Sequence, residues 1–239
     1  MPGRLLLVAT PIGNLDDLSP RAARALAEAD LVACEDTRHS GRLLAHLGVK
    51  KRLVSLHEHN ERKRVPELVA ALARGETIAV VSDAGTPLLS DPGYPLVRAA
   101  IAAGATVEAI PGPSAILAAL VASGLPPYPF TFAGFAPPKA GKRRTFYRRL
   151  GGLGHTVVVY ESPHRLVASL DDALAELGAD RPAALARELT KLHEEIVRGT
   201  LAELAAWAGE RKLLGELVLV IGADTAESAP TSARDEKPS

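Results

Sequence analysis

The first half of the chain alternates short apolar runs with longer segments whose apolar residues recur at helical spacing. The runs, rich in Val, Ile, Leu and Ala, predict strands at 4–9, 31–34, 52–56, 77–82 and 106–110. The segments between them predict helices, which begin near Ser19-Pro20, Thr37, Asn60 and Asp91-Pro92. Strands separated by helices need crossover connections, so this half predicts a mostly parallel sheet.

The pattern changes after an apolar helix expected over 114–122, because Gly124 opens a proline-rich link. Beyond it, strands are predicted at 131–135, 156–160, 183–188, 194–198 and 217–221. Helices are expected after Ser162-Pro163 and after Thr200, which forms a capping box with Glu203. The short link between 188 and 194 predicts an antiparallel pair. We therefore expect an α/β domain over 1–123, a mixed α/β domain over 124–222 and a disordered tail over 223–239.

Composition narrows the class of protein. The chain has 239 residues, 47% of them hydrophobic, and a formal net charge of zero, which gives no overall attraction to nucleic acid. Cys34 is the one cysteine, so a disulfide within the chain is excluded and a thiolate metal site is not expected. No apolar run reaches membrane-spanning length, and the start lacks a signal-peptide core. These features favour a soluble cytoplasmic protein without a bound metal.

Three loops of small residues follow the first, fourth and fifth predicted strands: TPIGNL at 10–15, SDAGTPLLSDPG at 82–93 and PGPSA at 111–115. In an open α/β sheet, the carboxyl ends of the strands form the edge where ligands bind. Gly and Pro allow a close approach of the backbone, but a P-loop lysine and a three-glycine dinucleotide fingerprint are both missing. We expect a small ligand with a polar or cationic group near Asp83. The alternative is an Asp that bonds only its own turn.

Two other groups of charged residues could carry chemistry. Asp36 lies in Glu35-Asp36-Thr37-Arg38 at the end of the second predicted strand, where it could serve in acid–base catalysis or cap a helix. Glu188 and Lys191 lie at another strand end, and Lys191 could be a catalytic ammonium or a surface charge. His57-Glu58-His59 lacks a third metal ligand nearby.

The strongest local charge signal lies in PPKAGKRRTFYRRL at 137–150. Residues 109–160 contain no Asp or Glu, and Phe146 and Tyr147 interleave with the cations. This segregation favours contacts to RNA phosphates with possible base stacking, whereas a solvated helix face is the alternative. The predicted RNA-binding residues are Lys139, Lys142, Arg143, Arg144, Arg148 and Arg149.

Taken in order, VATPIGNLDDLSPRA, ACEDTRHS, VVSDAGTPLLSDPG, IPGPSA, FAGF and ARELTKLHEE resemble a known set of motifs. The set is typical of the tetrapyrrole-methylase-like (class III) S-adenosylmethionine-dependent methyltransferases, in the branch that methylates ribosomal RNA. The resemblance covers roughly residues 4–222, and only the tail lies outside it.

The resemblance implies two α/β domains with the cofactor in the cleft between them, and a homodimer. A sulfonium is an intrinsically good methyl donor, so no metal is expected. It implies 2′-O-methylation of a cytidine ribose in the decoding region of 16S ribosomal RNA. The candidates for taking the hydroxyl proton are Asp36, Glu188 and Lys191. By motif, the implied S-adenosylmethionine contacts are Ile12, Gly13, Asp83, Gly85, Thr86, Ser114, Ala115, Ala186 and Arg187.

Three alternatives remain open on the sequence. A methyltransferase of tetrapyrroles or other small molecules would share the cofactor loops but would not need the basic segment. An RNA-binding protein without activity would not need three ligand loops on one sheet edge. A doubly wound hydrolase or reductase would need a nucleophile elbow or a dinucleotide fingerprint, and neither is present.

Overall fold

The computed structural model describes residues 2–224 and divides the chain into two compact units. The first unit ends at Ala115 and also includes Thr190–Leu192, and the second unit takes the other described residues. This division falls before the helix at 115–122, whereas the proline-rich link suggested a boundary after residue 123. Most of the expected disordered tail, from residue 225 on, lies outside the described residues.

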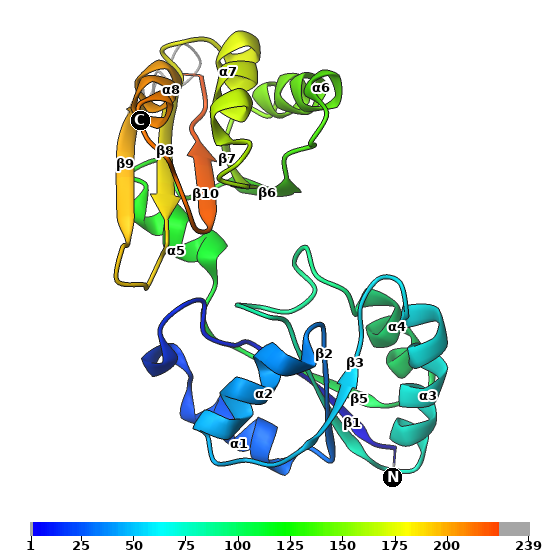
Figure 1. The fold of residues 1–239 in the computed structure, drawn as a ribbon. Helices are drawn as coiled ribbons and strands as arrows, with labels where there is room; N and C mark the ends of the chain where they lie inside the picture. The colour runs from blue at the N-terminus through cyan, green and yellow to red at the C-terminus, as the bar shows by residue number, and fades with distance from the viewer. Residues whose placement is uncertain (1, 225–239) are drawn as a thin grey trace, which may run out of the picture. The chain divides into compact units, whose positions relative to one another are not determined.

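The first unit is built on a five-stranded sheet in which every paired strand is parallel (Figure 1). Its spatial order is β3-β2-β4-β1-β5. This confirms the parallel sheet expected from the strand–helix alternation. The strands are β1 (Arg4–Val8), β2 (Leu31–Cys34), β3 (Arg52–Ser55), β4 (Thr77–Val81) and β5 (Thr106–Ile110).

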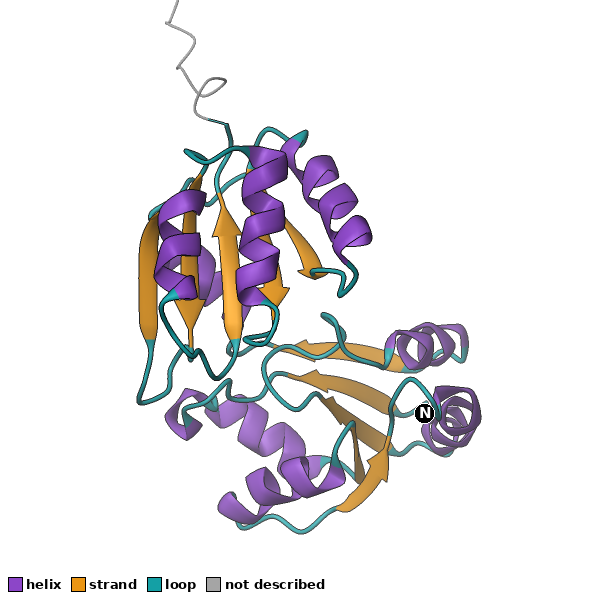
Figure 2. Cartoon of the chain, turned by 45° about the horizontal axis from the view of Figure 1, so that its top comes forward, coloured by secondary structure: helices purple, strands orange, loops and turns teal. Residues whose placement is uncertain are grey.

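Helices cover both faces of this sheet (Figure 2). Alternate residues of β1 point to opposite sides, so Leu5 packs with helices α3 and α4, while Leu6 packs with α1 and α2. A strand that is buried on both faces has no polar side, which is why the inner strands β2 and β4 read as continuous apolar runs. The helical elements are η1 (Leu15–Asp17), α1 (Pro20–Glu28), α2 (Thr37–His46), α3 (Glu61–Ala73) and α4 (Tyr94–Ala102).

The helix starts show which capping signals the fold uses. Ser19 caps α1 as expected, because its hydroxyl accepts a bond from the Ala22 amide at 3.0 Å. Asp36, and not Thr37, occupies the N-cap of α2. The start expected at Asp91-Pro92 was wrong by two residues. Helix α4 begins at Tyr94, because Gly93 has a φ of +121°, which is outside the helical region.

The second unit contains a mixed sheet, as expected, with the order β6-β7-β10-β8-β9. Strands β6 and β7 are parallel, and the other neighbours are antiparallel, including the predicted β8–β9 pair. The predicted capping box of Thr200 and Glu203 is present. The strands are β6 (Phe130–Phe135), β7 (Thr156–Glu161), β8 (Pro182–Arg187), β9 (Glu195–Thr200) and β10 (Leu217–Ile221).

Helices α6, α7 and α8 pack on one face of the mixed sheet. Their apolar side chains form the core together with Val157, Val159 and Leu219 of the strands. Helix α7 begins at Leu166, later than Ser162-Pro163 suggested, because a turn closed by the Arg165 amide and the Ser162 carbonyl comes first. None of the described helices combines the length and apolarity needed to cross a membrane. The helices are α5 (Ala115–Ala122), α6 (Ala140–Gly151), α7 (Leu166–Leu177) and α8 (Leu201–Gly209).

Candidate functional site

The three small-residue loops meet at the carboxyl edge of the parallel sheet. The backbones of Thr10 and Gly85 exchange two hydrogen bonds, at 2.9 and 3.0 Å, so the loops after β1 and β4 lie side by side. The Thr86 hydroxyl donates to the Pro113 carbonyl at 3.4 Å, which joins the loop after β5 to the same group. Ser114 follows directly. The fold therefore brings together the first-unit residues that the motifs suggested for cofactor binding.

Glycine is needed in these loops because the backbones approach closely. Gly85 has a φ of +78°, and a Cβ there would lie 3.2 Å from Cγ2 of the buried Ile12. A Cβ on Gly13 would overlap the aliphatic chain of Lys191. The resulting edge presents backbone N–H and C=O groups in place of bulky side chains. Such a lining suits a ligand that needs many directional hydrogen bonds in a small space.

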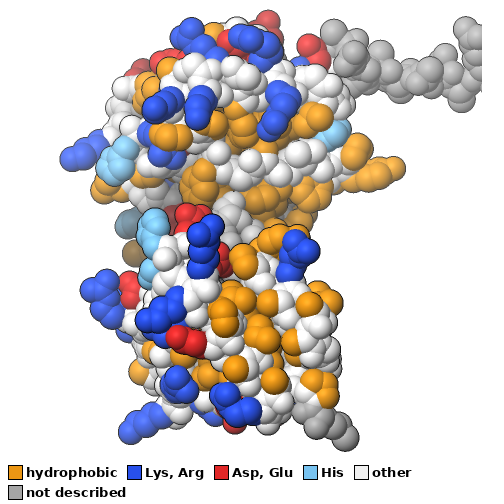
Figure 3. Space-filling view, turned by 90° about the vertical axis from the view of Figure 1, so that its right-hand side faces the viewer, with side chains coloured by type: hydrophobic (Ala, Val, Ile, Leu, Met, Phe, Trp, Pro, Cys, Tyr) orange, Lys and Arg blue, Asp and Glu red, His pale blue; other side chains and the backbone are white. Residues whose placement is uncertain are grey.

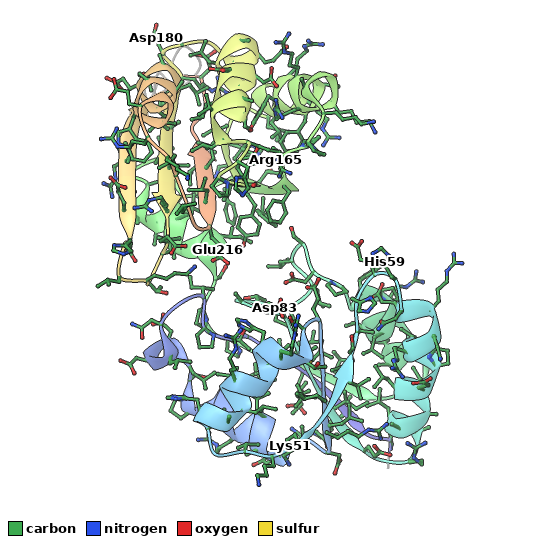
Figure 4. All side chains as sticks on the ribbon, in the orientation of Figure 1. Lys51, His59, Asp83, Arg165, Asp180 and Glu216 are labelled. Carbon is green, nitrogen blue, oxygen red and sulfur yellow. The ribbon has the colours of Figure 1, made fainter. Side chains whose placement is uncertain are left out.

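Carboxylates gather beside these loops (Figure 4, Asp83 labelled). Oδ1 of Asp83 accepts a bond from the Asp36 amide at 3.3 Å, which ties the loop after β2 to the loop after β4. Burial and the charge of Glu35 raise the pKa of Asp91 to about 6. Burial and the charge of Asp83 also raise the pKa of Glu35. The sequence reading gave Asp91 only a capping role, whereas the fold places it among acids whose negative potential favours a cationic ligand.

Asp36 is engaged in holding helix α2. Its Oδ1 accepts from the Arg38 amide at 2.7 Å, and its Oδ2 lies 3.2 Å from the Arg38 guanidinium. Hydrogen bonds from Arg38 lower the pKa of Asp36. This matches the capping alternative left open on the sequence. Within the described residues 2–224, no group of three or more His, Cys, Asp or Glu side chains is arranged to hold a metal ion.

Lys191 and Glu188 have different surroundings, although both lie in the β8–β9 turn. Lys191 belongs to the first compact unit and packs against Gly13. Glu188 has a φ of +51°, and its carboxylate accepts a bond from the Glu216 amide at 3.0 Å. A Cβ at Gly215 would overlap this carboxylate. Glu188 therefore fastens the segment before β10, whereas Lys191 reaches the first cofactor loop.

The other second-unit candidates are parts of β8. Ala186 is buried in the middle of the sheet, paired with Ile196 on β9. Arg187 lies at the end of the strand, where its guanidinium forms an ion pair with Glu195 at 3.4 Å. It also donates to the Leu214 carbonyl at 3.4 Å. Neither residue extends a free charged group from the sheet.

The basic segment forms α6, and Arg143 has a role other than the expected RNA contact. Its side chain is 6% exposed, and its guanidinium lies 2.6 Å from the carboxylate of Asp172 on α7. It also donates to the carbonyls of Pro138 and Ala168. A buried guanidinium with these partners cannot reach a phosphate, so the assignment of Arg143 to RNA was wrong and the residue joins α6 to α7.

The remaining cations of α6 are exposed, but two of them are paired. Arg144 binds Asp172 at 2.6 Å, and Arg148 binds Glu176 at 2.8 Å. Lys139, Lys142 and Arg149 form no ion pair within residues 2–224. The sequence reading missed these acids because Asp172 and Glu176 lie outside the acid-free segment. The available signal was that the two acids are four residues apart on a predicted helix, the same spacing as Arg144 and Arg148, so that all four side chains can pair.

The aromatic residues of α6 also differ from the expected base-stacking role. Tyr147 is completely buried, and its hydroxyl lies 2.7 Å from Oγ of Ser169. Burial raises the pKa of Tyr147 to about 12. Phe146 packs against the same apolar core. Both rings stabilise the helix layer, and Tyr147 is not open to a base.

Comparison with known proteins assigns the class. The family model of tetrapyrrole (corrin/porphyrin) methylases matches residues 4–205. The chain belongs to this family of methyltransferases, as its motifs indicated.

Closely similar curated relatives carry the name ribosomal RNA small subunit methyltransferase I. The relative from Mycobacterium tuberculosis is 53% identical over 221 residues, which is 92% of this chain and 77% of the relative. The relative from Escherichia coli O157:H7 is 48% identical over 92% of this chain and 77% of its own length. The Synechocystis relative is 46% identical over 98% of this chain and 84% of its own.

Solved structures agree on the fold. Diphthine synthase superposes with a TM-score of 0.73 at 17% identity, covering 92% of this chain and 90% of that one. Uroporphyrin-III C-methyltransferase from Thermus thermophilus, complexed with S-adenosylhomocysteine, has a TM-score of 0.65 at 22% identity, covering 92% and 97%. These likenesses show a shared architecture of two α/β units.

Proposed function

We propose that this protein transfers a methyl group from S-adenosylmethionine to the 2′-hydroxyl of a cytidine in the decoding region of 16S ribosomal RNA. The observation that carries the proposal is the meeting of the motif loops on one sheet edge, in a chain 53% identical to a ribosomal RNA small subunit methyltransferase I. We further propose that it acts in the cytoplasm as a homodimer.

The first unit supplies the main cofactor contacts in this proposal. When bound, S-adenosylmethionine supplies a methyl group activated by its sulfonium. Ile12, Gly13, Gly85 and Thr86 bind it through their loop backbones, and the loop after β5 adds Ser114 and Ala115. The carboxylate of Asp83 accepts hydrogen bonds from either the amino group or the ribose hydroxyls. Ala186 and Arg187 add contacts from β8.

Of the three candidates for handling the substrate hydroxyl, Lys191 has the strongest support. Asp36 is occupied by the start of α2, and Glu188 by the Glu216 amide. The side chain of Lys191 packs against the first cofactor loop, at Gly13, whereas Asp36 reaches the loop after β4 only through its backbone amide. We assign it the task of orienting an oxygen of the target ribose. Correct orientation of the hydroxyl toward the methyl group is a large part of what such an enzyme must provide.

The test is to incubate the protein with labelled S-adenosylmethionine and three acceptors: small ribosomal subunits, naked 16S RNA and a free tetrapyrrole. We expect label in RNA, and resistance of one cytidine linkage to alkaline cleavage, because a 2′-O-methyl group blocks attack by the 2′-oxygen. Transfer to the tetrapyrrole alone would contradict the proposal. Label on a base, with all linkages still cleavable, would contradict the 2′-hydroxyl assignment.

A further inference from the structure

Aromatic side chains are concentrated at one edge of the mixed sheet. The chain contains four Phe and four Tyr residues, and most of them belong to β6, to the residues just before it or to the end of β7. Strand β6 is the outermost strand on its side of the sheet. We define the aromatic edge as Tyr128, Phe130, Phe132, Phe135 and Tyr160.

Three rings of the aromatic edge form a cluster, and part of the edge remains open to solvent. Tyr160 contacts Phe132, with ring centroids 4.9 Å apart, and Phe135, with centroids 5.2 Å apart. Phe135 is 54% exposed and Tyr128 is 83% exposed. Tyr160 thus backs Phe135 from within the sheet, so that a rigid ring is presented to solvent at little cost in side-chain freedom.

The register of the strands places these rings on one side. Phe132 pairs with Val158 and Phe135 with Tyr160, whereas Val157 and Val159 face the helices α6, α7 and α8. Since neighbouring residues of a strand alternate, Phe132 and Tyr160 face away from those three helices. The core of the unit therefore does not account for the exposed rings.

The chain segment that carries the aromatic edge contains basic residues and no acids. Residues 109–160 contain no Asp or Glu, and Lys139 and Lys142 lie just beyond β6 without an ion pair in the described chain. On the face that Figure 3 shows, the second unit carries both Lys or Arg side chains and hydrophobic side chains, and Asp and Glu side chains lie at its top. An exposed apolar surface bordered by free cations matches the chemistry of single-stranded RNA, which offers flat bases and negative phosphates.

We propose that the aromatic edge stacks an unpaired base of the RNA substrate, with Phe135 as the ring in contact. Lys139 and Lys142 bind phosphates next to that base. The inference rests on the proposed function, since it names how the RNA is held. It replaces the buried Tyr147 and the partly buried Phe146 as the aromatic contacts for RNA. The partner is unpaired RNA and not a duplex, because paired bases cannot offer an open face.

The test uses Phe135→Leu, which keeps an apolar side chain but removes the ring, and Phe135→Trp, which restores a ring. The probe is a short unpaired oligoribonucleotide, with a duplex of equal length as a second ligand. We expect Phe135→Leu to lose about ten-fold or more in affinity for the unpaired probe, and Phe135→Trp to retain affinity. Duplex binding should not change. Ile101→Ala is the matched control, since Ile101 is a 61% exposed apolar residue at the end of α4.

A salt series separates stacking from phosphate binding. Phe135→Leu removes no charge, so the slope of log affinity against log salt should stay as in the wild type. Lys142→Gln should reduce that slope by about 0.7, the value for one phosphate contact on a single strand. A change of slope in Phe135→Leu would contradict stacking.

Other outcomes would also overturn the proposal. Equal affinity of Phe135→Leu and wild type for the unpaired probe would show that no base stacks there. A loss of S-adenosylmethionine binding would assign the ring to the cofactor site, and a changed mass in solution would assign it to an interface between copies. If Phe135→Leu weakens RNA binding but the wild type methylates no ribosomal RNA, the aromatic edge stands and the proposed function fails.

Discussion

At the scale of single residues, the acids at the carboxyl edge of the parallel sheet differ in the hydrogen bonds that they already make, and so in their capacity to bind a ligand. Asp36 is engaged by α2, whereas Asp83 bonds one amide and Asp91 is held among other acids with a raised pKa. Position at a strand end did not separate these roles. The hydrogen-bond partners separate them, because a carboxylate already bound to its own helix has less capacity left for a ligand.

Substitution of Asp83 should weaken S-adenosylmethionine binding. Loss of a charge-assisted hydrogen bond costs about 1.5–3 kcal/mol, or roughly ten- to a hundred-fold in affinity. Asp83→Ala also removes the acceptor of the Asp36 amide, so Asp83→Asn is the better comparison, because it keeps an oxygen there and removes only the charge. Calorimetry on both variants measures the effect. If both folded variants bind as tightly as the wild type, Asp83 is only a turn residue.

Asp91 should make stability depend on pH. Its pKa is about 6 in the folded protein, against 3.8 normally, so between these values only the folded state keeps the proton. The associated stability is complete below about pH 4 and is lost as the pH rises through 6, by about 1–3 kcal/mol. Asp91→Asn cannot lose a proton.

Urea unfolding of Asp91→Asn and wild type at several pH values between 4 and 7.5 tests this dependence. The free energy of unfolding of the variant should rise relative to that of the wild type across this range. A constant difference between the two proteins would show that the proton on Asp91 is not retained on folding.

At the scale of elements, helix α6 has two functions on its two sides. The inner side carries Arg143 and Tyr147, which bind Asp172 and Ser169 on α7. The outer side carries cations, of which Lys139, Lys142 and Arg149 have no ion pair within the described chain. The helix therefore uses part of its positive charge for its own attachment to α7.

Neighbouring residues of α6 should respond very differently to the same substitution. Arg143→Met breaks a buried ion pair and should lower the free energy of unfolding by about 3 kcal/mol. Lys142→Met changes an exposed side chain and should alter it by less than about 0.5 kcal/mol. Chemical denaturation of both variants provides the measurement. Equal stability of the two variants would show that the Arg143–Asp172 pair contributes nothing to the free energy of unfolding. Because Arg143→Met is expected to destabilise the fold, variants designed to test RNA binding should leave Arg143 unchanged.

Much of the element pattern was predictable because it is local. Strands β2 and β10 lie where the apolar runs placed them, since every residue in both is buried and a strand buried on both faces is apolar throughout. The start of α4 was missed because it depends on the φ of Gly93. The burial of Arg143 was missed because its partner comes from another helix, and a charge pattern along the chain does not show which acids return to it in space.

The site was predictable to a similar degree. The small-residue loops follow parallel strands, so their meeting at one edge follows from topology alone. The packing of Lys191 against Gly13 could not be foreseen, because it joins segments far apart in the chain. The aromatic edge was hidden for another reason: the alternation of β6 shows one apolar side, but it does not show that Phe130 and Phe135 remain 38% and 54% exposed in the fold.

At the scale of the whole molecule, the turn between β8 and β9 contains residues of both compact units. Thr190–Leu192 pack with the first unit, while the strands on either side belong to the second. Gly13 is the point of contact, since any side chain there would overlap Lys191. The lack of a side chain at Gly13 thus allows the loop after β1 to contact the turn between β8 and β9, far along the chain, at the candidate site.

Gly13→Val should therefore reduce the stabilisation that S-adenosylmethionine gives to the protein. A ligand at one hundred times its Kd stabilises the folded state by about 2.7 kcal/mol. The variant, at the same concentration, should show a clearly smaller rise in Tm. Gly209→Ala is the matched control, because a Cβ at Gly209 meets nothing within 4 Å. An unchanged rise in Gly13→Val would show that this contact does not shape the cofactor site.

The inner position of β1 in the parallel sheet, between β4 and β5, has a consequence for biosynthesis. Arg4 pairs with Thr77 on one side and with Thr106 on the other, so the first strand of this sheet to be made lies between the last two. At about 5–20 residues per second, a ribosome needs several seconds to translate the chain from β1 to β5. During that time, an apolar strand waits without its neighbours. The growing chain should be most prone to aggregate, and most dependent on chaperones, in the interval before β5 leaves the ribosome.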